Sequence, residues 1–149
     1  MPTAEDIKEI CRSICYDENG LYIEGDTLLD CMKGVYENIT IPDNITAIGD
    51  HAFSGIAVLE LTLPQGVTTI GDYAFMGAEI HSLTIPEGVT SIGSHAFSWI
   101  RGLEILTLPD SLTSIADEAF EQDYSSFSVI YKGVTYLGDM TPLYEAVNG

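Results

Sequence analysis

One short motif recurs four times along this chain at a nearly constant spacing, and it constrains the fold more than any other feature. Its proline and its phenylalanine each recur in steps of 22, 22 and 23 residues. Because both markers slip at the last step, the extra residue lies around Trp99 to Glu104. A coil of this length cannot bury its apolar face alone, so successive coils must stack, which predicts a solenoid. The markers are Pro42, Pro64, Pro86, Pro109, Phe53, Phe75, Phe97 and Phe120.

Each coil contains two apolar segments separated by the proline. Before it, apolar residues alternate with threonine, a pattern typical of a half-buried strand, which the proline ends because it cannot donate to the ladder. After the second segment, we expect a glycine with positive φ, then a helix N-cap and an Ala-Phe pair within a helical turn. The phenylalanine is expected to fill the space between coils. The expected strands are 39–41, 61–63, 83–85 and 106–108, the glycines Gly49, Gly71 and Gly93, and the caps Asp50, Asp72, Ser94 and Asp117.

The third copy reads Ile-Pro-x-x-Val-Thr-x-Ile-Gly-x-x-Ala-Phe over residues 85–97. This pattern closely resembles the BspA-like (Treponema pallidum-type) leucine-rich repeats, and the resemblance covers about residues 37–121. It implies an α/β repeat fold, a right-handed leucine-rich-repeat solenoid of four regular coils. The chain departs from the family where a cysteine often follows the phenylalanine, and we interpret the replacements as packing substitutions. They are Gly55-Ile56, Gly77-Ala78 and Trp99-Ile100.

The two ends depart from the repeat, as terminal caps of an array should. Apolar residues at helical spacing predict an amphipathic helix over residues 4–15 that covers the first coil, with a partner-binding helix as the alternative. Hairpins are predicted over 21–29 and 128–137, and Thr141 is expected to cap a short helix through about Val147. We therefore expect one structural domain in three parts: 1–36 as an N-terminal helix-hairpin cap, 37–121 as the four repeats, and 122–149 as a C-terminal hairpin-helix cap.

The chain is strongly acidic, with a formal net charge of -18 over 149 residues. Nucleic acid binding needs basic groups against phosphates, so this charge excludes that class of function, and it disfavours anionic lipid as well. It favours a soluble monomer, with attraction to basic partners or weak calcium binding as the alternative. No apolar run approaches the ~20 residues of a membrane span. The acidic N-terminus is unlike a signal peptide, which leaves open an intracellular protein or a segment of a secreted parent.

The three cysteines are Cys11, Cys15 and Cys31. An odd number cannot form a closed disulfide framework, so we expect buried free thiols. A bridge between Cys31 and either of the others stays open for an exported protein.

The polar residues that recur from coil to coil do not predict a catalytic, cofactor or metal site. His51, Tyr73, His95 and Glu118 occupy one slot in successive coils, and a spacing of about 4.8 Å per coil places the two histidines roughly 10 Å apart. Zinc requires each ligand nitrogen at about 2.1 Å, so a shared ion is excluded and a solvent-facing ladder is expected. Aspartates at the cap positions raise the alternative of calcium, but they suit N-capping without an ion. We expect no enzymatic activity.

The function is expected to lie on an open surface. Side chains between the buried strand residues should form one exposed sheet face, and Trp99 is either an interface anchor or packed under the longer loop. The resemblance implies an adhesin-like, host-interaction module of a bacterial surface that binds extracellular matrix protein or glycan; the alternative is an intracellular scaffold unit. Four coils give only ~20 Å of sheet, which favours multivalent binding. The candidate residues are Asn38, Thr40, Glu60, Thr62, Ser82, Thr84, Trp99, Ile105 and Thr107.

Overall fold

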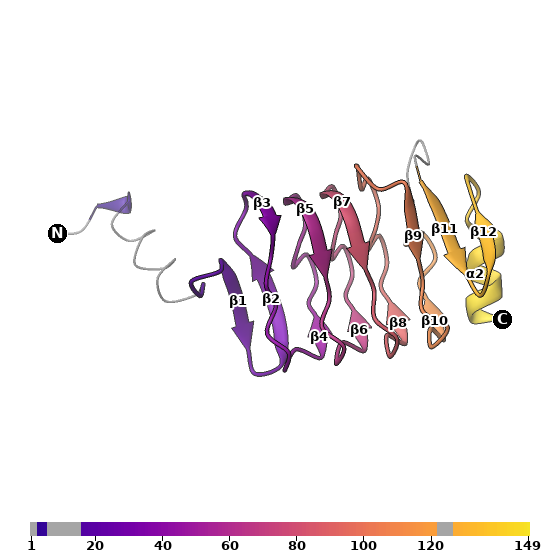
Figure 1. The fold of residues 1–149 in the computed structure, drawn as a ribbon, viewed down its shortest axis with the longest axis horizontal. Coiled ribbons are helices and arrows are strands. Elements are labelled where there is room, and N and C mark those ends of the chain that lie inside the picture. The colour runs from indigo at the N-terminus through magenta and orange to yellow at the C-terminus, as the bar shows by residue number, and fades with distance from the viewer. Residues whose placement is uncertain (1–2, 6–15, 122–126) are drawn as a thin grey trace.

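The computed structural model describes residues 3–5, 16–121 and 127–149. It is an elongated stack of coils with the C-terminal helix at one end (Figure 1). Most of the helix expected over residues 4–15 lies outside the described residues, as do Cys11 and Cys15. The elements are β1 Leu21–Glu24, β2 Thr27–Cys31, β3 Val35–Asn38, β4 Ala47–Ile48, β5 Ala57–Thr62, β6 Thr69–Ile70, β7 Glu79–Thr84, β8 Ser91–Ile92, β9 Ile105–Thr107, β10 Ser114–Ile115, β11 Ser128–Tyr131, β12 Val134–Tyr136 and α2 Thr141–Asn148.

The strands form two layers around one apolar core. One layer is a six-stranded sheet in the order β1-β2-β4-β6-β8-β10, whose last five strands are parallel. The other layer consists of two three-stranded sheets, β3-β5-β7 and β12-β11-β9. Each regular coil therefore contributes a two-residue strand to the first layer and a longer strand to the second. The solenoid predicted from the repeat is confirmed.

The phenylalanines form one interior column, as expected. Neighbouring rings in the series Phe53, Phe75, Phe97 and Phe120 are stacked with centroids 5.4, 5.3 and 5.2 Å apart. The first three are completely buried, and the alanine before each of them is buried as well. The small alanine allows the backbones of adjacent coils to approach, and the ring fills the space beside it.

The helical turn expected around the Ala-Phe pair is absent from the four described coils, which have turns there instead. The residue two before each phenylalanine has a positive φ: 60° at His51, 58° at Tyr73, 55° at His95 and 69° at Glu118. Left-handed backbone interrupts a right-handed helix before one turn is complete. The regular coils are thus β-strands joined by turns, so the α/β class was wrong for the repeat itself.

The glycines that recur at the repeat spacing, Gly49, Gly71 and Gly93, were expected to have a positive φ, but they do not. They instead allow adjacent coils to pack closely. A Cβ on Gly71 would lie 2.8 Å from the backbone nitrogen of Asp50 in the preceding coil, and one on Gly93 would lie 2.6 Å from that of Asp72. The aspartates also differ from prediction. Asp50 Oδ1 accepts a hydrogen bond from the Asp72 N–H at 2.8 Å, and Asp72 Oδ1 accepts one from the Ser94 N–H at 2.8 Å. These carboxylates join one coil to the next, and they cap no helix.

The two hairpins are confirmed, as β1-β2 and β11-β12. The strand expected over 39–41 in the first coil is replaced by β3, which ends at Asn38. The C-terminal helix α2 begins at Thr141, but its N-cap is Met140, and Asp139 Oδ1 accepts the Thr141 N–H at 2.9 Å. Asn148 bonds both backbone groups of Ile115 through its side chain, at 2.9 and 2.7 Å, which ties α2 to the edge strand β10.

Cys31 carries a free thiol that is completely buried at the end of β2. Burial raises the pKa of this thiol from 9.0 to about 11, so it stays protonated at neutral pH. Among the described residues, every helix is too short or too polar to cross a bilayer.

Candidate interaction surface

Four strands bring most of the predicted surface residues onto the same layer. Asn38 pairs in register with Glu60, which pairs with Ser82, and Thr62 pairs with Thr84. All of the nine predicted residues are exposed. The residues between the buried strand positions thus form rows across β3, β5 and β7, as the repeat predicts. We call this set the row surface: Asn38, Glu60, Thr62, Ser82 and Thr84.

The nine residues do not lie on one continuous sheet, however. Ile105 and Thr107 belong to β9, which pairs with β11 in a sheet separate from that of β7; the isolated bridge between Glu79 and Arg101 lies ahead of β9 in the chain. Thr40 follows the end of β3, and Trp99 lies in the turn before β9. The cause is the extra residue of the 23-residue step, which shifts β9 away from the register that the other coils share.

The break between β7 and β9 exposes the edge of the core. Leu83 and Ile85 in the third coil are each 8% exposed, whereas the equivalent Leu61 and Leu63 are 1% and 0% exposed. A shallow groove of about 340 Å³ lies along this seam, and Ile105 contributes to its wall. At this seam, β7 and β9 are each the edge strand of a separate sheet, although both lie inside the stack.

The same layer carries an exposed leucine that the repeat pattern does not predict. Leu59 is 53% exposed because β5 has two consecutive outward residues, Leu59 and Glu60. Strict alternation predicts only one outward residue at this point. The register confirms the irregularity, since the pairing of β5 with β7 skips the row of Leu59 and His81. Leu59 on β5 and Ile105 on β9 are exposed large apolar residues of this layer, and Trp99 lies in the turn that leads into β9.

Trp99 is an exposed aromatic residue in a backbone conformation that suits glycine. Its φ is 60°, and the side chain remains 46% exposed. The equivalent positions of the two preceding coils are Gly55, with φ 73°, and Gly77, with φ 69°. Non-glycine residues in this region cost about 1–2 kcal/mol. Two coils of this fold therefore have glycine at this position, whereas Trp99 adds exposed apolar area and costs conformational free energy.

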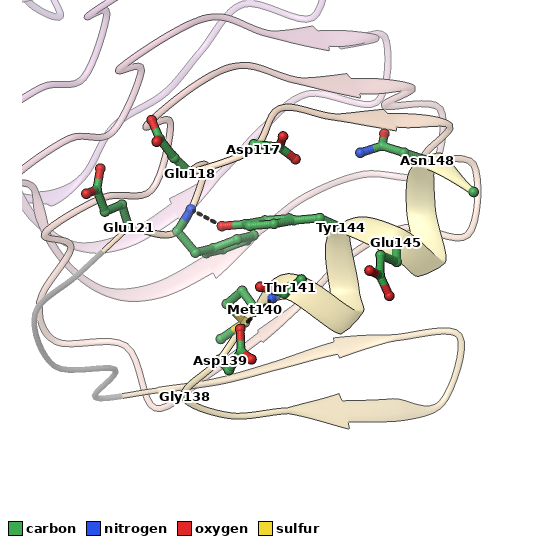
Figure 2. A pocket seen from close by; sticks show the side chains of 12 residues that line it. Asp117, Glu118, Glu121, Gly138, Asp139, Met140, Thr141, Tyr144, Glu145 and Asn148 are labelled. Carbon is green, nitrogen blue, oxygen red and sulfur yellow. Dashed lines mark hydrogen bonds between the residues drawn. The ribbon is translucent and has the colours of Figure 1, made fainter.

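A second hollow lies at the C-terminal end, between the turn of the fourth coil and α2 (Figure 2). It is an open groove of about 790 Å³ with a partly apolar floor of Phe120, Met140 and Tyr144. The Tyr144 hydroxyl accepts a hydrogen bond from the Phe120 N–H at 3.0 Å, and burial raises the pKa of Tyr144. The repeat predicts an open face without a pocket. The groove is an addition to that picture, because a hollow between segments distant in sequence leaves no periodic pattern. The carboxylates at its rim are Asp117, Glu118, Glu121, Asp139 and Glu145.

These rim carboxylates are all exposed to solvent. Backbone hydrogen bonding from Thr141 lowers the pKa of Asp139, which holds it in the charged form. General acid chemistry at neutral pH requires the opposite, a carboxyl group whose pKa burial raises. The lowered pKa of Asp139 is thus opposite to that of a general acid, and the groove offers negative charge beside apolar surface.

The histidine slot forms the expected ladder. The rings of His51 and Tyr73 are stacked at 4.8 Å, and those of Tyr73 and His95 at 5.0 Å. The histidines are thus two coils apart, with the Tyr73 ring between them. His95 instead contacts Glu118 and Glu121 of the next coil, each at 3.1 Å. Glu121 was missed because it lies outside the repeating slot.

The fold and its surfaces define a class of protein: a repeat solenoid with exposed strand rows. The BspA-type leucine-rich repeat region matches residues 31–141 with six copies, and the chain belongs to this family. Six copies exceed the four that proline and phenylalanine mark, and β11 extends the stack in parallel beyond the fourth coil without those markers.

Two solved structures of bacterial proteins share the fold. A leucine-rich repeat protein from Bacteroides capillosus has a TM-score of 0.59 and 21% identity, over 78% of this chain and 97% of that one. A leucine-rich repeat protein of T. pallidum has a TM-score of 0.51 and 18% identity, over 78% and 69% of the two chains. Among curated proteins, no sequence matches this chain.

Proposed function

We propose that this chain is a non-catalytic protein-interaction module of a bacterial surface or host-interaction protein, which binds through the strand layer around Trp99. Membership of a leucine-rich repeat family supports an interaction role. The position of the binding surface is inferred from Trp99, which has a backbone conformation suited to glycine and an exposed side chain. A strained residue persists where the surroundings or the function require it, and aromatic residues are enriched among the anchors of interfaces.

The chemistry of the surface defines the partner that it fits. Leu59, Trp99 and Ile105 offer separate apolar contacts, and the same layer carries the exposed carboxylates of Glu37, Glu60 and Glu104. A protein with apolar side chains flanked by basic residues complements this pattern. Extracellular matrix proteins meet the description, and a glycan remains the second class of ligand. The small area of four coils favours display in several copies, which raises avidity without new contacts.

The test is a binding screen with the chain displayed on a tetramer. Purified extracellular matrix proteins and a glycan array are the probes, and we expect saturable binding to at least one protein. Ile105→Asp should weaken that binding at least tenfold, because it places a charge in the apolar seam. Ser114→Asp is the matched control, since it adds the same charge on β10 of the other layer. Equal loss in both variants, or no saturable binding, would favour the intracellular scaffold.

A further inference from the structure

The side chains of His95, Glu118 and Glu121 form a cluster that the interaction role does not use. Within the described residues, it is the group of three whose metal-ligating atoms all lie within 4.8 Å of one another. His95 Nε2 lies 3.1 Å from Glu118 Oε2, and His95 Nδ1 lies 3.1 Å from Glu121 Oε2. The histidine comes from the turn of the third coil and both glutamates from that of the fourth, so the cluster links two coils.

Ser98 determines which nitrogen of His95 carries a proton. This serine is completely buried, and its hydroxyl donates its one hydrogen to the Glu118 carbonyl at 3.2 Å. The same hydroxyl oxygen lies 3.3 Å from His95 Nδ1, so it accepts a hydrogen bond from that nitrogen. The Glu121 carboxylate is a second acceptor beside Nδ1. His95 Nδ1 is therefore protonated, and a neutral imidazole directs the lone pair of Nε2 at Glu118.

A lone pair and a carboxylate oxygen at 3.1 Å repel each other unless a proton or a metal ion lies between them. We propose that His95 Nε2 and Glu118 bind a zinc ion, with Glu121 and Ser98 as positioning residues on Nδ1. Zinc lies about 2.1 Å from nitrogen and oxygen ligands, which at the tetrahedral angle puts two ligand atoms about 3.4 Å apart. The observed separation is close to this value. Water completes the shell, since the glutamate side chains are 62% and 57% exposed.

The surroundings of His95 match the way proteins hold a metal-binding imidazole. Such a histidine donates its other N–H to a carboxylate or another acceptor, which fixes its tautomer and the orientation of its ring. Here Glu121 and Ser98 are the acceptors, and the stacked ring of Tyr73 supports one face of the imidazole at 5.0 Å. His51 provides the contrast within the same chain. Its neighbour in the slot of the next coil is the Tyr73 ring, where His95 has Glu118.

The test is calorimetric titration of the full chain with ZnCl2 at pH 7.5, with excess Mg²⁺ to saturate non-specific carboxylate sites. The wild-type chain should bind one more zinc ion than His95→Gln, and His51→Gln should bind as many as the wild type. Glu118→Gln should lose the ion, because an amide is a poor zinc ligand. Glu121→Gln and Ser98→Ala should weaken binding by about tenfold or more, as changes behind a metal-binding histidine do.

A spectroscopic readout separates zinc from a proton at Nε2. Nitrogen-15 NMR should show a metal-dependent shift of Nε2 in His95 and none in His51. The proposal is overturned if wild type and His95→Gln bind equal amounts of zinc. It is also overturned if both nitrogens of His95 remain protonated at saturating zinc, since a proton then occupies the position between the two groups. Neither outcome depends on whether the strand layer binds a partner.

Discussion

At the scale of single residues, glycines and aspartates fix how closely the coils approach. Gly71 lies against the backbone of Asp50, and the carboxylate of Asp50 accepts the N–H of Asp72 from the next coil. Where the aspartate becomes Ser94, the glycine above it becomes Ala116. The two changes occur together because alanine fits only where the neighbouring side chain leaves room. Close approach of adjacent coils, and not backbone freedom, therefore explains the glycine.

Gly71→Ala should destabilise the fold by about 1–3 kcal/mol, the usual cost of overpacking. The added Cβ would lie 2.8 Å from the Asp50 nitrogen, and backbone cannot move aside cheaply. Gly34→Ala is the matched control, because a Cβ at that position would lie at an ordinary 3.4 Å from its nearest neighbour, the Tyr36 ring. Urea unfolding measures both. Equal midpoints in the two variants would contradict this explanation of the glycine.

Cys31 makes the free energy of unfolding depend on pH in the alkaline range. Its pKa is raised by burial from 9.0 to about 11, so between these values the folded chain holds more protons than the unfolded one. Stability from this group is complete below about pH 9 and is lost as the pH rises toward 11. The wild type should therefore lose stability relative to Cys31→Ala over this range, as measured by urea unfolding at pH 8–11. If the difference in unfolding free energy between wild type and Cys31→Ala stayed constant from pH 8 to 11, burial of the Cys31 thiol would not be the source of a pH dependence.

At the scale of elements, the strands were predictable and the turns were not. Alternation before the prolines locates β5, β7 and β9, and like residues at 22-residue steps predict the phenylalanine column. The turns follow from backbone sterics that the residue types do not reveal, since histidine, tyrosine and glutamate share one left-handed position. An aspartate suits an N-cap as well as it suits a hydrogen bond to the next coil, so the residue type alone does not show which of the two roles Asp50 and Asp72 have.

The helix α2 should protect the edge of the last regular coil. Asn148 satisfies both the N–H and the C=O of Ile115, which would otherwise face solvent at the end of the sheet. Asn148→Ala should accelerate amide exchange at Ile115 and cost about 1–2 kcal/mol, the loss of two modest hydrogen bonds. Glu145→Ala, an exposed position of the same helix, serves as the control and should leave that amide unchanged.

At the scale of the whole molecule, the candidate site was only partly predictable. The repeat identifies which side chains face outward, and all nine predicted residues are exposed. It does not show that one extra residue divides the layer between β7 and β9, nor that Leu59 turns outward at an irregular pair. The groove beside α2 and the contact of His95 with Glu121 depend on segments brought together by folding.

Tetrameric display should increase the apparent affinity of the chain by about 10²–10⁴-fold over the monomer. The reason is the small footprint of four coils, which limits what one copy can bind. Surface plasmon resonance on the protein found in the screen compares the two forms at matched surface density. A monomer that binds as tightly as the tetramer would show that one copy provides the complete interface.

The central claim is that Trp99 serves a partner and that the fold does not require it. The decisive measurement pairs the unfolding free energy with the partner affinity of Trp99→Gly, using the matrix protein identified in the screen. Glycine relieves the left-handed strain and removes half-buried area, so stability should change by less than about 1 kcal/mol, while affinity falls more than tenfold. Intact affinity with a large loss of stability would contradict the claim, because Trp99 would then be a packing residue.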